Sequence, residues 1–249
     1  MTRLIFVCAV AVVSCSPAPA ALVTATPRPT PTPTLFSPTT APTAAPSPTG
    51  PALRYVAIGA SDTVGVGAAD PRTGSWPARV AARLPADTVY VNLGVSGSLA
   101  AQAAREQLPR ALGLRPQLVT VWLAVNDLNA GVIPTDYAAA LRSVVAPIVS
   151  RSDARVFVGT VPDLRSVPAY AGADKVALLA RIDAYNAAIA TLAAAFPGRV
   201  TAVDLFTGSG PLVSTITVSA DGFHPSDAGY ALIADRFANA IAGAGIAIH

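Results

Sequence analysis

The chain reads Tyr55-Val56-Ala57-Ile58-Gly59-Ala60-Ser61-Asp62, an apolar run that ends in small residues just before two polar side chains. A short apolar run that is rich in β-branched residues is typical of a fully buried strand of a parallel sheet. Further runs of this kind occupy residues 89–93, 118–124, 156–161 and 200–205. The sequence therefore predicts five short buried strands, the first of which covers residues 55–59.

Alanine-rich stretches with helical spacing separate these runs. The predicted helices cover residues 76–84, 100–112, 137–150, 175–196 and 227–242, and Ser226 is a candidate N-cap for the last one. Strand and helix alternate along the whole segment, which is the pattern of a parallel sheet covered by helices on both faces. We therefore expect a three-layer α/β/α sandwich with a five-stranded parallel sheet, of the flavodoxin-like type.

Polar residues follow four of the predicted strands at the point where each strand ends. In open α/β sheets the ligand site lies beyond the carboxyl ends of the strands. The residues at these ends are Ser61-Asp62, 94–97, Asn126-Asp127 and Pro162-Asp163. A functional site is expected along this edge.

The segment Asp221-Gly222-Phe223-His224-Pro225 contains one of the two histidines of the chain, and the other is the terminal His249. A serine hydrolase needs an imidazole to accept the proton of its nucleophile, and a carboxylate to orient that imidazole. Asp221 lies three residues before His224, so one tight loop can bring the two groups together. The alternative is a histidine of a surface loop without a chemical role.

Each remaining candidate has a structural alternative. Ser61 can present its hydroxyl as a nucleophile, or it can cap the following helix. Gly94 can direct its N–H at a developing oxyanion, or it can serve only the turn. Asn126 can supply a second oxyanion donor from its side-chain amide, or it can form an Asx turn with Asp127.

Taken together and in this order, the residues resemble the SGNH hydrolases, also called the GDSL esterase/lipase family. That family has an N-terminal Ser, then a Gly, then a Gly-x-Asn-Asp segment, and an Asp-x-x-His segment near the C-terminus. The resemblance covers residues 54–242 and includes Ser75-Trp76-Pro77. By position it implies Ser61 as the nucleophile, His224 as the general base and Asp221 as its orienting group. It also implies an oxyanion hole made of the backbone N–H groups of Ser61 and Gly94 and the side-chain amide of Asn126.

Two positions depart from the family pattern. The Gly-Asp-Ser of the family is Gly59-Ala60-Ser61 here, so a carboxylate before the nucleophile is missing, although Asp62 follows it. The first glycine of Gly-x-Asn-Asp is Ala124, which we expect to be a small change at a buried position. Neither departure removes a group that transfers a proton.

The N-terminal part predicts export. Residues 1–15 contain Arg3 and then an apolar run too short to span a bilayer, as in a signal peptide, and they end at Cys15 as in a bacterial lipoprotein signal. Lipidation at Cys15 would anchor the protein to the cell envelope. The alternative is secretion after ordinary cleavage near residues 18–21. Residues 16–52 are rich in Pro and Thr and predict a disordered tether that reaches on the order of 100 Å when extended. The hydrolase domain is predicted over residues 53–249.

Composition excludes several classes of site in this domain. Both cysteines precede it, and it has a single non-terminal histidine, so neither a disulfide nor a histidine-rich metal centre is expected. The net charge is only +3 and the basic residues are scattered, which gives no support for nucleic-acid binding. The glycines at 59, 65 and 67 do not match a dinucleotide-binding pattern. No cofactor is expected, and a monomer is the working expectation.

These observations favour an exported serine esterase that acts through an acyl-enzyme. The resemblance implies ester substrates of small alcohols, lipids or carbohydrates. An acyltransferase that uses the same residues, or a surface binding module without activity, are the alternatives. A preference for short acyl chains is expected, because no long apolar lid is evident in the sequence.

Overall fold

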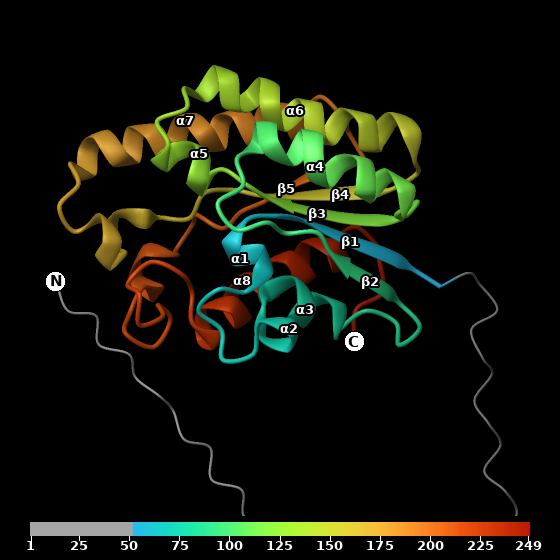
Figure 1. Cartoon of the computed structure of the whole chain (residues 1–249), viewed down its shortest axis with the longest axis horizontal. Coiled ribbons are helices and arrows are strands. Elements are labelled where there is room, and N and C mark those ends of the chain that lie inside the picture. The colour runs from blue at the N-terminus through green and yellow to red at the C-terminus, as the bar shows by residue number, and fades with distance from the viewer. Residues whose placement is uncertain (1–51) are drawn as a thin grey trace, which may run out of the picture. The chain divides into compact units, whose positions relative to one another are not determined.

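In this computed structural model the described residues are 52–249 (Figure 1). The predicted signal peptide, its lipidation site Cys15 and nearly all of the predicted tether lie outside these residues. The described part forms three layers, with a central sheet and helices on both sides. This architecture confirms the predicted α/β sandwich.

All five strands of the sheet are parallel, and they lie in the order β2-β1-β3-β4-β5. This is the flavodoxin-like order. In the register of the central strands, Tyr55 lies opposite both Tyr90 and Leu118. The strands are β1 Arg54–Gly59, β2 Val89–Asn92, β3 Leu118–Trp122, β4 Arg155–Gly159 and β5 Val200–Val203.

Alternating residues of the strands face two separate hydrophobic cores. Val56 and Ile58 of β1 face one core, and Tyr55 and Ala57 face the other. On the first face lie α4 Ala100–Gly113, α6 Pro134–Arg151 and α7 Lys175–Ala194. On the second face lie α3 Trp76–Ala81 and α8 Asp227–Gly243.

Aromatic stacking joins the second face to the sheet. The ring of Trp76 stacks on Phe237 of α8 at 4.2 Å between centroids and meets Trp122 of β3 edge-on at 6.1 Å. Aromatic pairs of this kind contribute about 0.5–1.5 kcal/mol beyond the area that they bury. Trp76 of α3 thereby contacts both α8 and β3.

Helix α7 is long and apolar enough to span a membrane by length and composition, and it is the one such helix among the described residues. In this structure it lies in the outer layer beside α6. Its buried side chains belong to the core of the first face; they are Leu178, Ile182, Tyr185, Ile189 and Leu192.

The element boundaries differ from the predicted ones mainly at the edge where the site is expected. Strand β3 ends at Trp122, two residues earlier than predicted, because the chain turns there into α5 Val125–Asn129. The short helices α1 Ser61–Val64 and α2 Pro71–Gly74 were not predicted. Helices of one turn carry no periodicity that a sequence pattern can register. The predicted N-cap of α8 is confirmed, since the Ser226 hydroxyl accepts a hydrogen bond from the Gly229 N–H.

Candidate active site

Ser61 lies where β1 ends, and it is the first residue of α1. Its exposed fraction is 7%. The turn before it requires glycine, because a Cβ added at Gly59 would lie 1.9 Å from the Oγ1 of Thr63. Ser61 does not act as the N-cap of α1, since that position is Ala60 and has no side-chain cap. The serine hydroxyl is therefore available for another partner.

A buried glutamine holds the turn from the opposite face of the sheet. The Oε1 of Gln107 on α4 accepts a hydrogen bond from the Gly59 N–H at 3.0 Å. Its Nε2 donates to the Gly59 carbonyl at 2.9 Å and to the Ser98 hydroxyl at 3.1 Å. Sequence reasoning missed this role because a lone glutamine in an amphipathic helix carries no motif.

The structure brings Ser61 together with His224 and Asp221 from the other end of the chain. The Nε2 of His224 lies 2.9 Å from the Ser61 Oγ, and its Nδ1 lies 2.6 Å from the Asp221 Oδ2. The histidine side chain is 15% exposed and that of Asp221 is 43% exposed. Both distances are within hydrogen-bonding range, so the three groups form a continuous chain of hydrogen bonds.

Asp221 organises its own loop. Its Oδ1 accepts hydrogen bonds from the Ser219 hydroxyl and from the N–H groups of Phe223 and His224, at 2.8–2.9 Å. Partial burial acts to raise the pKa of Asp221, but the hydrogen bonds from His224, Phe223 and Ser219 outweigh it and hold that pKa well below its ordinary value. An ionised carboxylate can only accept hydrogen bonds. The Nδ1 of His224 must then carry the hydrogen, which leaves Nε2 free to accept the hydroxyl hydrogen of Ser61.

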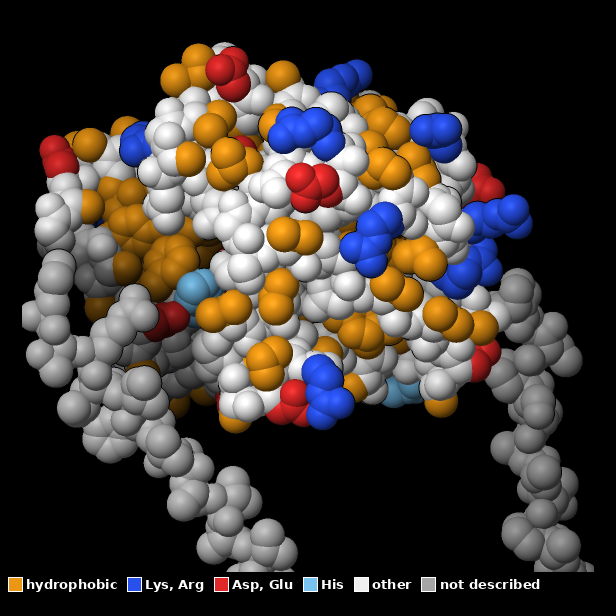
Figure 2. All heavy atoms as spheres, in the orientation of Figure 1, with side chains coloured by type: hydrophobic (Ala, Val, Ile, Leu, Met, Phe, Trp, Pro, Cys, Tyr) orange, Lys and Arg blue, Asp and Glu red, His pale blue; other side chains and the backbone are white. Residues whose placement is uncertain are grey.

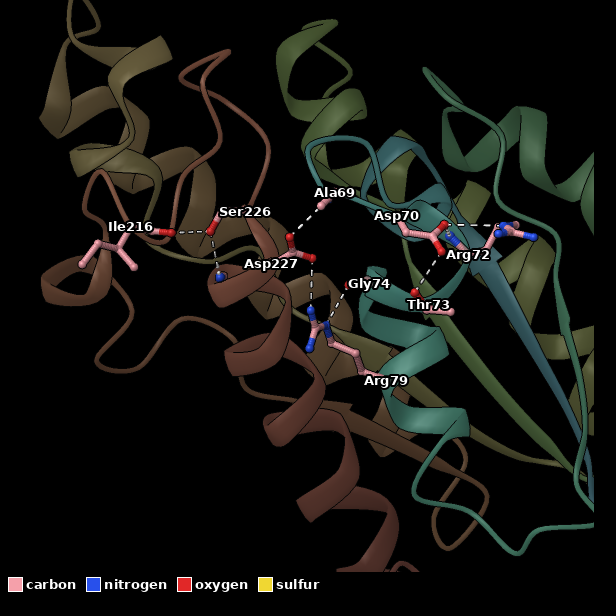
Figure 3. Close-up of polar contacts among 10 residues, drawn as sticks. Ala69, Asp70, Arg72, Thr73, Gly74, Arg79, Ile216, Ser226 and Asp227 are labelled. Atoms are coloured by element: carbon pink, nitrogen blue, oxygen red, sulfur yellow. Dashed lines mark hydrogen bonds and ion pairs between the residues drawn. The ribbon is translucent and has the colours of Figure 1, made fainter.

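The segment after the serine is fastened to the start of α8, just after the histidine (Figure 3). The carboxylate of Asp227 accepts hydrogen bonds from the Ala69 N–H at 3.2 Å and from the Arg79 Nη2 at 3.1 Å. Arg79 also donates to the Gly74 carbonyl at 2.8 Å. These contacts join regions about 150 residues apart in sequence, so they help to set the distance between the serine and the histidine.

Asn126 lies beside the serine turn. It lines a small hollow together with Ala60 and Asp62, the two neighbours of Ser61. Its Nδ2 donates to the Ser98 carbonyl at 3.3 Å. A carboxamide nitrogen carries two hydrogens, so one remains for a ligand. The Asx turn that was the alternative for Asn126-Asp127 is not what Asp127 forms, because both of its carboxylate oxygens accept the Ala100 N–H at the start of α4.

Gly94 has a different environment from the one that its expected role requires. Its N–H donates to the Oδ1 of Asn92 at 2.9 Å, and the Nδ2 of Asn92 donates to the Thr63 carbonyl at 2.6 Å. In this state the single N–H of Gly94 is directed at a protein acceptor. Its role as an oxyanion donor stays a prediction, and it requires the carboxamide of Asn92 to turn away.

Ala124 adopts a conformation that favours glycine. Its φ is 127° and its ψ is −44°, and its side chain is fully buried. A non-glycine residue with such a φ is strained by about 1–3 kcal/mol. The expectation that alanine is a small change here is therefore wrong for the backbone, because the turn from β3 into α5 needs a positive φ.

An apolar pocket of about 120 Å³ opens beside the site. Figure 2 shows hydrophobic side chains gathered in a hollow next to one of the two histidines. The walls of the pocket include Leu164 and Val167 from the loop after β4. They also include Phe223 and Pro225, on either side of the catalytic candidate His224. The backbone N–H of Ala169 donates to the Gly222 carbonyl at 2.9 Å, so the loop after β4 lies against the histidine loop. That loop forms a wall of the pocket.

Asp62 lines both the small hollow and the larger pocket. Burial raises its pKa to about 6, and the neighbouring charge of His224 opposes part of that rise. In the sequence, Asp62 was notable because it directly follows Ser61, whereas the family pattern has its aspartate directly before the serine. Its place in the cleft was not evident before the fold was known.

Residues 57–232 match the model of the GDSL-like Lipase/Acylhydrolase family. No curated protein matches the sequence. The described fold is similar to the crystal structure of TesA, with a TM-score of 0.63 and 22% identity over 77% of this chain and 99% of that chain.

Two further solved structures have the same fold. One is an acetylxylan esterase from Geobacillus stearothermophilus in a catalytic mutant form, with a TM-score of 0.61 and 19% identity over 75% of this chain and 93% of that chain. The other is a two-domain esterase active on acetylated mannans, with a TM-score of 0.55 and 18% identity over 77% of this chain and 50% of that chain. At these identities the likeness concerns the fold.

Proposed function

The chain belongs to the GDSL-like lipase/acylhydrolase family, and from that premise we propose that Ser61, His224 and Asp221 make it an exported serine esterase. Membership in this family makes the chain a carboxylic ester hydrolase. The proposal adds the residues, the mechanism and the location. The single observation that carries it is the hydrogen-bonded series from the Ser61 Oγ through His224 to Asp221, at 2.9 and 2.6 Å.

In the proposed first step, the Ser61 Oγ attacks the ester carbonyl carbon while the Nε2 of His224 takes the hydroxyl proton. The carboxylate of Asp221 stabilises the imidazolium that forms and keeps the ring in the required tautomer. The imidazolium then gives its proton to the leaving alcohol oxygen as the C–O bond breaks. An acyl-enzyme on Ser61 results.

The negative charge that develops on the carbonyl oxygen needs donors at the edge of the sheet. The Ser61 N–H has no acceptor among the described residues, and Asn126 retains one Nδ2 hydrogen. These two groups, with the Gly94 N–H once Asn92 releases it, would form the oxyanion hole. One such donor contributes roughly 10²–10³ in kcat in a well-studied protease.

In the second step, water takes the place of the alcohol. The Nε2 of His224 removes a proton from the water as its oxygen attacks the acyl carbon. The imidazolium then gives this proton to the Ser61 Oγ as the C–Oγ bond of the tetrahedral adduct breaks, which releases the acid and restores the serine hydroxyl. The same acyl-enzyme would transfer its acyl group to an acceptor alcohol if that alcohol outcompeted water. Product analysis with and without added alcohol separates hydrolase from acyltransferase.

The substrate that we propose is an acetyl or other short-chain ester, including acetyl groups on a polysaccharide. Two proteins with this fold act on acetylated carbohydrates, one on acetylxylan and one on acetylated mannans. The predicted export of the chain would give access to such polymers. Lipidation at Cys15 would hold the enzyme at the cell envelope, and a Cys15→Ala variant should then leave the membrane fraction.

The test is a series of p-nitrophenyl esters from acetate to palmitate. We expect the wild type to hydrolyse acetate fastest, and Ser61→Ala and His224→Ala each to lose at least about a thousandfold in kcat. Ser150→Ala is the matched control, because Ser150 is exposed on α6 and its hydroxyl bonds only to the Pro147 carbonyl. A fluorophosphonate probe should label Ser61.

Two outcomes would contradict the proposal. Wild-type protein that neither hydrolyses any ester nor reacts with the probe would be a binding module that keeps the fold without activity. Faster turnover of palmitate than of acetate would leave the mechanism standing and overturn the short-chain substrate.

A further inference from the structure

Asp62 is a carboxylate in the substrate cleft that the proposed proton transfers do not use. It follows Ser61 directly in the chain, and it lines both the hollow shared with Asn126 and the apolar pocket beside His224. A group that borders both spaces lies where a substrate passes from the reacting carbonyl into the pocket. The charge and hydrogen-bonding capacity of the Asp62 carboxylate therefore affect which substrates can bind.

The other polar side chains of the pocket already have partners. Asp163 pairs with Arg165 through two hydrogen bonds of 2.8 and 2.9 Å. Arg236 donates to the carbonyls of Asp204 and Thr207. The hydroxyls of Ser209 and Thr217 donate to carbonyls of their own loop.

Asp62 differs from these residues. Among residues 52–249, the hydrogen bond that its carboxylate receives comes from its own backbone N–H, and no side chain donates to it. The rest of the lining is largely apolar, with Trp122, Val125 and Phe223 near it. A partly buried carboxylate that receives only one backbone hydrogen bond is costly, and a ligand that brings a further donor offsets that cost.

We propose that Asp62 selects esters that carry a hydroxyl group close to the reacting carbonyl, with the carboxylate accepting the hydrogen bond of that hydroxyl. This inference rests on the proposed esterase function and names the substrate class of the same site. The apolar walls of the pocket would hold the hydrocarbon part of the substrate. Hydrogen bonds to charged acceptors are strong enough to discriminate between substrates by about 10- to 100-fold.

A hydroxyl suits this position better than an ammonium group, although both are donors. His224 becomes positively charged when it takes the proton of Ser61, and its charge acts on Asp62. An ammonium ion bound to Asp62 would stand near the imidazolium and disfavour its formation. A neutral hydroxyl donates without this repulsion.

The test uses matched esters in which one group is changed. On the alcohol side the pair is 3-hydroxybutyl acetate and 3-methylbutyl acetate. On the acyl side the pair is methyl 3-hydroxybutanoate and methyl 3-methylbutanoate, with methyl 3-aminobutanoate as the cationic member. Acid release in a pH-stat gives kcat/KM for each ester.

Wild-type enzyme should favour the hydroxyl member in at least one pair, and Asp62→Leu should lower that hydroxyl-to-methyl ratio by about 10- to 100-fold. Asp62→Asn, which keeps an acceptor oxygen and the side-chain size, should give an intermediate ratio. Asp87→Asn and Asp87→Leu are the controls, because Asp87 is exposed and lies before β2, at the opposite edge of the sheet. They should leave the ratio unchanged.

Suppose that the hydroxyl-to-methyl ratios of wild type and Asp62→Leu agree within twofold in both pairs, while the methyl-substituted member of each pair is still hydrolysed. This result would overturn the role of Asp62 and leave the esterase intact. A preference for the amino ester over the hydroxy ester would overturn the choice of hydroxyl. Wild-type enzyme that hydrolyses none of these esters or the p-nitrophenyl esters would defeat the esterase proposal itself, and this inference with it. Should Asp62→Leu not fold, the Asp62→Asn ratio decides.

Discussion

The turn that carries Ser61 and the loop that carries His224 reach the same point in opposite ways. Ser61 is buried at the end of a central strand, and the turn before it is held by Gln107 from a neighbouring helix. His224 lies in a surface segment, residues 213–226, that contains no helix and only a single-pair β-bridge, between Val218 and Pro225. The first region depends on packing across the whole domain, whereas the second depends on bonds among near neighbours.

The difference shows that short-range hydrogen bonds position one catalytic candidate and long-range hydrogen bonds position the other. In the histidine loop, the bonds of Asp221 to Ser219, Phe223 and His224 span at most three residues. Around the serine, the contacts of Gln107 with Gly59 span 48 residues. Substitutions in the loop should therefore affect activity more than stability, and substitutions around the serine turn should affect stability directly.

Asp221→Asn should give the largest effect and confirm the local character of the loop. The amide can donate to the Nδ1 of His224 and favour the wrong tautomer, so kcat should fall by roughly 10³–10⁴-fold. The midpoint of urea unfolding at pH 7 should fall only modestly: the substitution removes the stability that accompanies the lowered pKa of Asp221, but the amide oxygen can still accept the hydrogen bonds of the loop. Asp227→Asn is the control: it weakens the contacts with Ala69 and Arg79, and it should lower stability more than activity. Equal losses of activity in Asp221→Asn and Asp227→Asn would contradict the expectation that the histidine loop affects activity more than stability.

Gln107→Leu should destabilise the protein by about 2–4 kcal/mol, because the buried N–H and carbonyl of Gly59 lose their partners. Chemical denaturation measures the change. Gln102→Leu in the same helix is the matched control, since its side chain bonds only to Glu106 at the surface. A Gln107→Leu variant as stable as the control would mean that the serine turn does not depend on this long-range contact.

Ala124→Gly should raise the free energy of unfolding by about 1 kcal/mol. Glycine adopts a φ of 127° without strain, and this gain exceeds the cost of removing one buried methyl group. Ala130→Gly at the end of the same short helix has a φ of −73° and should lose up to about 1 kcal/mol. Thermal unfolding of the two variants measures both changes in the free energy of unfolding. Changes of the same sign in the two variants would show that the backbone of Ala124 is not strained.

Asp62→Asn should change how stability depends on pH. Burial raises the pKa of Asp62 to about 6 in the folded state, so the folded protein binds this proton more tightly than the unfolded chain does. The wild type should lose stability relative to Asp62→Asn as the pH rises from 4 through 6, by up to about 3 kcal/mol, and the difference should level off above pH 7. A difference that does not vary with pH would show that Asp62 titrates normally.

Short-range patterns in the sequence determined much of this protein. Alternating apolar runs and helical stretches predicted the five parallel strands and the layers that cover them, because a strand buried on both faces is a continuous apolar run and a helix has a period of 3.6 residues, both of which are visible locally. The spacing from Asp221 to His224 predicted their contact for the same reason, since three residues of one loop suffice to form it.

Only the tertiary structure decided what depends on residues far apart in the chain. The contact of Ser61 with His224, the support of Gly59 by Gln107, and the capping of α4 by Asp127 join segments separated by 163, 48 and 27 residues. No local pattern encodes such distances. The carboxamide of Asn92, which accepts the Gly94 N–H, is itself held by the Thr63 carbonyl, 29 residues away. The positive φ of Ala124 follows from how the chain must turn once the sheet has formed.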